Sequence, residues 1–501
     1  MSMKSSRIRT LVAVCSCAAS LAAHAQVSGP ARAVYTDAWG ARVLRVQAQA
    51  GEAAPFSSRD VLWNYSNDFA AIPQSVAFSS AGPTLLAGDA LNGERIQTFH
   101  VPGDGVPSGE FAVNVDSPAA VATSAGTGRA AFIDGVEYTG PFTVRGLDPL
   151  TGPTWSFDVE APYSFGYASR QIKVSRDGST VAVGCSYYDQ NTQTSASRLY
   201  VLDAATGDLR CRWDGTGGIT AVDLNDTGTA CLVTNDAVGR LIDITAEAGV
   251  QTFSASASGA GGWFVISGNG NTIVVGGFNV AVWVKNGATW SRRILFQGAN
   301  QWYGWGLGVS HDGNTVVALS HDYANGYLDT YTRCWDVPSR TLLGTYHTVG
   351  SGGFQDSAQG ACVSDDGSTF AVCSWGAEDN NHPEVMVFDR TVHLLGGIDT
   401  PGSVFALAMT PDGQYVASGS KAVHANTFGN GGDVSLYGPA GNPCRADFNA
   451  DGFLDFFDYS DYVGCFETGE CPPGTSADFN GDAFVDFFDY VDFVDAFEAG
   501  C

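Results

Sequence analysis

Two stretches near the C-terminus place oxygen-bearing side chains at regular intervals. Each can be read as a twelve-residue loop with Asp or Asn at positions 1, 3, 5, 9 and 12 and a backbone carbonyl available at position 7. This alternation lets a short loop wrap around a hard cation that takes about six or seven oxygen ligands. The pattern predicts two calcium ions, held by Asp447, Asn449, Asp451, Phe453, Asp455 and Asp458 in the first loop and by Asp478, Asn480, Asp482, Phe484, Asp486 and Asp489 in the second.

The composition around these loops supports the same interpretation. Residues 444–501 contain 11 Asp, 3 Glu and 11 Phe, and Arg445 is their only basic residue. Several carboxylates gathered without an ion would repel one another, so we expect ion binding and folding to be coupled. A helix is expected after each loop, with a shared core of Phe457, Val463 and Phe466 or Phe488, Phe493 and Phe497. The alternative is an acidic amphipathic helix pair without metal.

The two loops belong to repeated segments, DFNADGFLDFFDYSDYVGCF from Asp447 and DFNGDAFVDFFDYVDFVDAF from Asp478. These segments resemble the type I dockerin, a duplicated calcium-binding module of secreted bacterial proteins. The resemblance implies a small α-helical, EF-hand-like domain over 444–501 that attaches to a cohesin-like or cell-surface partner. The chain departs from the family at position 6, where the second loop has Ala483 in place of Gly452, and this implies a weaker second site.

Two further departures concern the surroundings of the loops. Cohesin-binding dockerins usually carry small hydroxyl residues at positions 10 and 11, where this chain has Phe456-Phe457 and Phe487-Phe488, which argues against docking to an ordinary cohesin. Four cysteines flank the loops and are expected to clamp the pair through disulfides, with the pairing left open: Cys444, Cys465, Cys471 and Cys501.

Residues 60–438 are dominated by an internal repeat. A short apolar strand enters a Ser/Asp/Asn-Gly turn and leaves as a second apolar strand, and most units add a second hairpin. Four strands in roughly 45 residues are typical of a propeller blade. Eight turns predict a mainly β fold with eight blades, alternatively seven, and a β-solenoid or sandwich is the other possibility; the turn glycines are Gly82, Gly128, Gly178, Gly228, Gly270, Gly313, Gly367 and Gly413.

The S-x-D-G turns and the Trp335-Asp336 pair resemble the WD-repeat and related extracellular propellers. Residues 61–65 are a candidate for the strand that closes the ring, because their pattern predicts an outer strand that belongs to no complete blade. We expect them to pair with residues 433–437 and so remove two exposed sheet edges.

The N-terminus and the net charge bear on localisation. Residues 1–25 combine a basic start, an apolar run over 11–22 and Ala23-His24-Ala25, which predicts a signal peptide and a secreted, extracellular or cell-surface protein. Residues 26–59 form an N-terminal segment and residues 439–443 a linker. A formal charge of -27 argues against nucleic acid as a partner, and no later stretch is long and apolar enough to span a membrane.

The sequence leaves two functions open for the propeller. Common enzyme signatures are missing from the sequence, and aromatic residues in the loops suit an extracellular protein or carbohydrate ligand: Tyr163, Phe165, Tyr167, Trp302, Tyr303, Trp305 and Phe354. The first reading is a non-catalytic binding or scaffolding protein with a calcium-ordered tail. The alternative is a polysaccharide-active enzyme that uses Asp322 with Glu378 or Asp379 as an acid/base pair.

Overall fold

The computed structural model describes the chain in segments, and the predicted signal peptide and linker lie outside them. These segments contain strands β1 to β34 and helices α1 to α3. They comprise residues 32–36, 42–47, 61–66, 71–79, 84–90, 95–103, 105–113, 120–166, 168–236, 238–245, 250–254, 263–297, 301–322, 329–349, 358–376, 383–424, 431–438, 446–449, 454–469, 471, 475–479 and 484–499.

Eight sheets follow one another along the chain, and we number them blades 1 to 8. Blade 1 contains β4 (Ile72–Ser79), β5 (Thr84–Ala90), β6 (Arg95–His100) and β7 (Gly109–Ala112), and blade 2 contains β8 (Ala120–Thr123), β9 (Ala130–Asp134), β10 (Phe142–Asp148) and β11 (Gly152–Val159). Blade 3 contains β12 (Ile172–Val174), β13 (Thr180–Asp189), β14 (Thr194–Asp203) and β15 (Leu209–Thr216), and blade 4 contains β16 (Ile219–Leu224), β17 (Ala230–Asn235), β18 (Val238–Asp243) and β19 (Val250–Ser254). A short helix, α1 (Ala168–Gln171), precedes blade 3.

The second half of the ring repeats the arrangement. Blade 5 contains β20 (Trp263–Ile266), β21 (Thr272–Gly276), β22 (Asn279–Asn286) and β23 (Thr289–Gln297), and blade 6 contains β24 (Gln301–Val309), β25 (Thr315–Asp322), β26 (Asp329–Asp336) and β27 (Thr341–Val349). Blade 7 contains β28 (Ala358–Val363), β29 (Thr369–Ser374), β30 (Val385–Asp389) and β31 (Leu394–Ile398). Blade 8 contains β32 (Val404–Met409), β33 (Val416–Lys421) and β34 (Gly432–Tyr437), together with β3 (Val61–Ser66). The prediction of eight blades is therefore confirmed.

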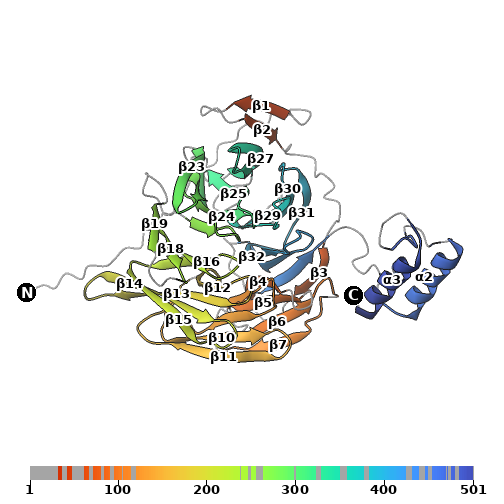
Figure 1. Cartoon of the computed structure of the whole chain (residues 1–501), viewed down its shortest axis with the longest axis horizontal. Coiled ribbons are helices and arrows are strands. Elements are labelled where there is room, and N and C mark those ends of the chain that lie inside the picture. Colours follow the sequence, from red (N-terminus) through yellow and green to blue (C-terminus); the bar gives the residue numbers. More distant parts are fainter. Residues whose placement is uncertain are drawn as a thin grey trace, which may run out of the picture.

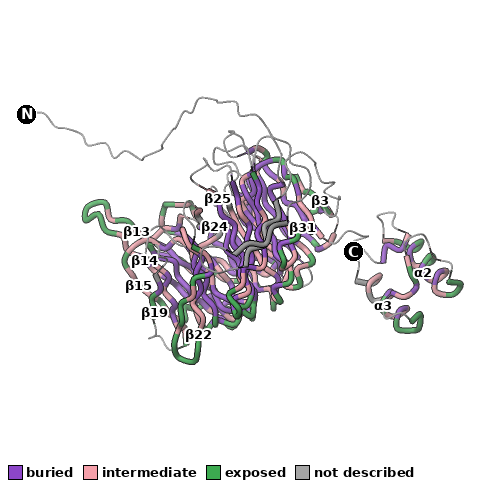
Figure 2. Tube along the Cα trace, turned by 90° about the horizontal axis from the view of Figure 1, so that it is seen from above, coloured by how far each residue is buried: buried purple, intermediate pink, exposed green. Residues whose placement is uncertain are grey.

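Neighbouring blades bury their faces against each other around a closed ring. The first strand of each blade contacts that of the next, and β32 of blade 8 contacts β4 of blade 1 (Figure 1). Each large apolar cluster combines residues of adjacent blades; Trp335, fully buried in blade 6, packs with Val274 and Val282 of blade 5. Buried residues accordingly follow the strands, while exposed residues gather at the hairpin ends (Figure 2).

The repeated turn is a compact hydrogen-bonded unit. In blade 6 the Ser310 hydroxyl donates to the Asp312 carboxylate at 2.6 Å, which also accepts the Asn314 amide at 2.9 Å, while the Thr315 amide donates back to Ser310 Oγ at 3.0 Å. The same bonds recur in blades 3, 7 and 8. The Ser and Asp side chains of an S-x-D-G turn therefore cap backbone amides of that same turn.

Backbone bonds connect one turn to the next. The His311 amide donates to the Asp365 carbonyl at 3.1 Å, and the Asp365 amide donates to the Pro411 carbonyl at 2.8 Å. The turn glycine has two roles here, since Gly313 has a φ of +75° and a Cβ at that position would lie 2.4 Å from Thr272 Oγ1 of the preceding blade. Another residue would strain both the turn and the approach between blades.

Strand β3 closes the ring as the sequence predicts. It pairs antiparallel with β34, so blade 8 is built from both ends of the propeller. Trp63 of β3 is 6% exposed, its indole ring stacks on Phe99 of blade 1 at 5.1 Å, and its Nε1 donates to the Pro102 carbonyl. The closure strand is thus held by side-chain packing as well as by its ladder.

The N-terminal segment contributes a hairpin that the sequence did not predict. β1 (Arg32–Thr36) pairs with β2 (Arg42–Gln47), and β2 runs parallel to β27, which makes blade 6 a six-stranded sheet. The remaining helices are α2 (Phe456–Thr468) and α3 (Phe487–Ala499). None of the helices in the described segments is long and apolar enough to cross a membrane.

Closure by β3 yields a stability prediction. Trp63→Ala should lower the free energy of unfolding by about 3 kcal/mol or more, because it removes a buried indole at the seam, and deletion of residues 60–66 should lower the melting temperature further. Val61→Ala is the matched control, since Val61 lies in the same strand but is 45% exposed. Thermal melts of the three variants test this; equal melting temperatures for the wild type and the deletion would contradict it.

Candidate functional site

Helices α2 and α3 lie side by side (Figure 1). Residues 31 positions apart occupy equivalent places, and such pairs meet each other. The hydroxyls of Tyr459 and Tyr490 are 2.7 Å apart, and the rings of Tyr462 and Phe493 stack at 3.9 Å with an interplanar angle of 7°. Duplication of the sequence is thus matched by a symmetric interface.

The core of this pair differs in part from the expected one. Phe466, Phe493 and Phe497 lie in or against it, as predicted. Phe457 and Phe488 were expected there but are 65% and 68% exposed. Each lies in the first turn of its helix, two residues after the Asp that precedes the helix. The sequence analysis missed their replacements, Phe448, Phe479, Tyr459 and Tyr462.

Eight of the twelve predicted ligand residues lie in the described segments. At position 12, Asp458 is completely buried; Asn449 N donates to its Oδ1 at 3.1 Å and Asp455 N donates to its Oδ2 at 2.9 Å. The equivalent Asp489 is also completely buried and accepts the Asp486 amide at 2.8 Å. Backbone amides of the described loop residues therefore hold both of these carboxylates. Outside the described segments lie Asp451, Phe453, Asn480 and Asp482.

The chemistry of the donor set fits a hard cation. Asp447, at position 1, is 5% exposed, and residues 446–501 contain no Lys, Arg or His to neutralise it or Asp458 and Asp489. Buried carboxylates are normally paired or metal-bound, and Asp, Asn and carbonyl oxygens are ligands that calcium prefers. Within the described segments, which omit two ligand positions of each loop, no three Asp, Glu, His or Cys side chains converge.

The cysteines of the described segments divide into two groups, and the predicted partners Cys444 and Cys501 lie outside these segments. Cys465 and Cys471 form a disulfide that ties α2 to the segment before the second loop, with a Cα–Cα distance of 4.5 Å. Cys185, Cys211, Cys231, Cys334, Cys362 and Cys373 carry free thiols. Burial raises the pKa of Cys185, Cys334 and Cys362 to about 12, so these thiols stay protonated at neutral pH.

A cavity of about 540 Å³ occupies the centre of the propeller, and blade 3 supplies its basic side chains, Arg170, Lys173 and Arg176. The Arg170 guanidinium lies 4.8 Å from the Trp263 ring centroid. At the turn end, Arg176 Nη1 lies 2.5 Å from Asp365 Oδ2 of blade 7, the blade opposite in the ring, and 3.8 Å from Asp226 of blade 4. These ion pairs connect blade 3 with blades 4 and 7 at the turn end of the channel.

Two of the loop aromatic residues that were predicted to form a ligand surface do not lie on the surface. Phe165 and Tyr303 are interior residues, 1% and 0% exposed, so their predicted role on a binding surface is wrong. Tyr163 lies under the Arg198 guanidinium at 4.3 Å. Tyr167 and Phe354 are outside the described residues, as are the side chains of Trp302 and Trp305.

The predicted acid/base group is only partly described. Asp322 ends β25, and Glu378 and Asp379 lie outside the described residues. The neighbouring His321 is 3% exposed, and burial lowers the pKa of its imidazole to about 4. At neutral pH His321 is therefore uncharged.

Glu384 is a buried carboxyl group between blades 7 and 8 that the sequence analysis did not identify. It is completely buried, and its Oε2 accepts the Thr400 amide at 2.8 Å. Gly376 leaves room for it, since a Cβ there would lie 2.0 Å from Glu384 Oε1. Burial raises the pKa of Glu384 to about 8, which keeps the group neutral at pH 7.

Comparison with known proteins supports the fold alone. No family model matches the chain, and no curated protein matches it. Among solved structures, the crystal structure of the C-terminal WD40 domain of Sif2 is similar, with a TM-score of 0.52, 13% sequence identity, and coverage of 75% of this chain and 99% of that chain. The chain thus has a WD40-like, eight-bladed β-propeller.

Glu384 predicts a specific pH dependence. The unfolded chain releases this proton near pH 4.5 and the folded protein near pH 8, so stability falls as pH rises through that window. Glu384→Gln should match the wild type at pH 4 and be more stable at pH 9, by at most about 5 kcal/mol. Denaturant unfolding across pH tests this, with Glu160→Gln, whose side chain is 74% exposed, as control. Parallel profiles for wild type and Glu384→Gln would contradict it.

Proposed function

We propose that the chain is an exported, non-catalytic binding or scaffolding protein, in which the propeller presents an extracellular ligand surface and a calcium-ordered, dockerin-like tail attaches it. The observation that carries the proposal is the burial of Asp458 and Asp489, at equivalent positions of the repeat, within residues 446–501, which contain no Lys, Arg or His. Two calcium ions would neutralise these carboxylates together with the remaining loop oxygens.

The ligands each have a position that suits this role. Asp458 and Asp489 would bind at position 12 while their backbone hydrogen bonds hold the carboxylates in place. Asp455 and Asp486 also begin the helices, because each accepts the amide two residues on, at 2.7 and 2.8 Å. Loop and helix are therefore coupled, and ion binding would order both.

An exposed apolar surface supports attachment through the tail. Its members follow the same 31-residue repeat and are 65–72% exposed: Phe456, Phe457, Phe487 and Phe488. Pairs of large, exposed aromatic side chains on a soluble domain typically mark an interaction site. We assign them to an apolar surface of a cell-surface protein, since these positions carry aromatic rings where a cohesin-binding dockerin carries hydroxyls.

Calcium dependence tests the first half of the proposal. The full-length protein, stripped with a chelator, should gain helicity and thermal stability on calcium titration, by about 2.7 kcal/mol at a hundredfold excess over Kd. Asp447→Asn with Asp478→Asn should abolish the gain. The control replaces Asp461 and Asp492, which are also 31 residues apart but exposed, with Asn. No calcium response in the wild type would refute the site.

Surface association tests the second half. Replacing Phe456, Phe457, Phe487 and Phe488 with Ser should release the protein from the producing cells into the medium while leaving its calcium response unchanged. Val106→Ser with Leu150→Ser is the control, because these propeller residues are 61% and 74% exposed. Cell fractionation and immunoblotting measure the outcome. Retention of the Phe variant on cells at the wild-type level would count against tail-mediated attachment.

A further inference from the structure

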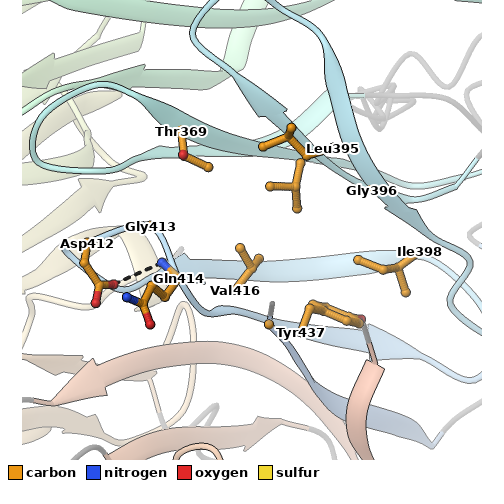
Figure 3. Close-up of a pocket in the computed structure, with 11 residues that line it drawn as sticks. Thr369, Leu395, Gly396, Ile398, Asp412, Gly413, Gln414, Val416 and Tyr437 are labelled. Atoms are coloured by element: carbon orange, nitrogen blue, oxygen red, sulfur yellow. Dashed lines mark hydrogen bonds between the residues drawn. The ribbon is translucent and has the colours of Figure 1, made fainter. Parts of the chain in front are cut away.

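A cavity of about 260 Å³ lies between blades 7 and 8, on the turn side of the propeller (Figure 3). Thr369 and Leu395 approach it from blade 7, and Val416 and Tyr437 from blade 8. Its inner wall is apolar, formed by Val387, Leu395, Ile398 and Val416, whereas Asp412 and Gln414 lie at its exposed rim. The cavity thus combines an apolar interior with an acidic mouth.

Comparison with the interface between blades 5 and 6 explains why this space is open. There Arg293 of β23 pairs with Val282 and donates from Nη1 to the Val337 carbonyl of blade 6 at 3.3 Å. Trp155 of blade 2 bridges to the Ala204 carbonyl of blade 3 in the same way, at 3.0 Å. An outer-strand side chain therefore spans the gap between blades at both interfaces.

Three substitutions in the repeat remove this cover between blades 7 and 8. Gly396 pairs with Val387 where Arg293 pairs with Val282. Tyr437 pairs with Val416 where Trp335 pairs with Val316, and its hydroxyl is held 2.7 Å from Ser418 Oγ. Gly438 follows Tyr437 where Asp336 follows Trp335. The smaller side chains leave open the space that Arg293 covers between blades 5 and 6.

The size and polarity of the cavity select a ligand class. An apolar cavity of about 150 Å³ holds one benzene-sized molecule, so 260 Å³ accommodates a ring with a short substituent. Asp412 uses Oδ1 for both its turn hydrogen bonds, at 2.6 and 3.0 Å, and its carboxylate stands at the mouth of the cavity. An ammonium group there would be attracted, and a carboxylate repelled.

We infer that this cavity is a binding site for a small aromatic amine, with the ring between blades 7 and 8 and the ammonium group at Asp412. The site goes beyond the attachment proposed for the tail and does not depend on calcium. This inference assigns a ligand to the interface between blades 7 and 8, and it assigns no ligand to the central channel.

Binding to the full-length protein can be measured with 2-phenylethylamine, the anion 3-phenylpropionate and neutral indole as probes. The amine should bind with a Kd of about 1 mM or tighter and at least several-fold more tightly than the anion, with indole in between. Gly396→Arg should reduce binding of all three at least tenfold by introducing the side chain that blade 5 carries. Gly396 is not among the glycines with positive φ, so its backbone accepts a side chain.

A second variant separates ring recognition from charge recognition. Asp412→Asn should keep indole binding and remove the preference for amine over anion, and it should fold, because Asn269 makes the same turn bonds in blade 5, at 2.8 and 2.9 Å. Gly464→Arg adds the same charge as Gly396→Arg at a site with open space around it and should bind like the wild type. The inference is overturned if none of the probes binds, or if Gly396→Arg binds them like the wild type.

Discussion

The fold depends on satisfying the backbone groups at the edges of a ring of sheets. Each blade alone would expose two edges and two apolar faces, and the faces are covered only when neighbours pack on both sides. The chain of turn-to-turn hydrogen bonds through Asp226, His311 and Asp365 sets the order of the blades at one end. The pairing of β3 with β34 completes blade 8, so the ring is held by strands from both of its ends. The packing of the blades, and with it the cavity between the last two blades, depends on this closure of the ring.

The tail meets a different constraint, which is electrostatic. The propeller pairs its buried charges internally, as Asp134 does with Arg145 at 2.6 Å. The tail buries Asp458 and Asp489 within residues 446–501, which contain no Lys, Arg or His. Backbone amides supply part of the compensation, and the proposed calcium ions would supply the rest. The aromatic interface around Tyr462 then joins the two loops into one unit, so an ion bound at one loop would also stabilise the helix of the other.

The sequence predicts those parts of the structure that recur. Eight turns, each with its glycine, predict the blades, and the same reasoning identifies residues 61–65 as the closing strand because they lack a hairpin partner. Features that depend on a single interface were not predictable. Glu384 is buried only because Gly376 makes room for it across a loop, and Phe457 is exposed because of where the helix begins rather than because of its type. The spacing of the loop oxygens predicts the ligand positions, but only the structure places Asp458 inside the backbone of its own loop.

The cavity between blades 7 and 8 follows from the way the ring closes. In blade 6 the chain turns from its third strand into a fourth, and Asp336 caps that turn by accepting the Ser339 amide at 2.9 Å. Blade 8 takes its fourth strand, β3, from the N-terminal side, so Tyr437 at the end of β34 does not lead into the fourth strand of its own blade. A capping residue is not needed there, and Gly438 stands in the place of Asp336. The interface between blades 7 and 8 is thus free of the capping requirement seen in blade 6, and there the repeat can vary without loss of the fold. A ligand site is therefore better tolerated at this interface than between blades whose turns must be capped.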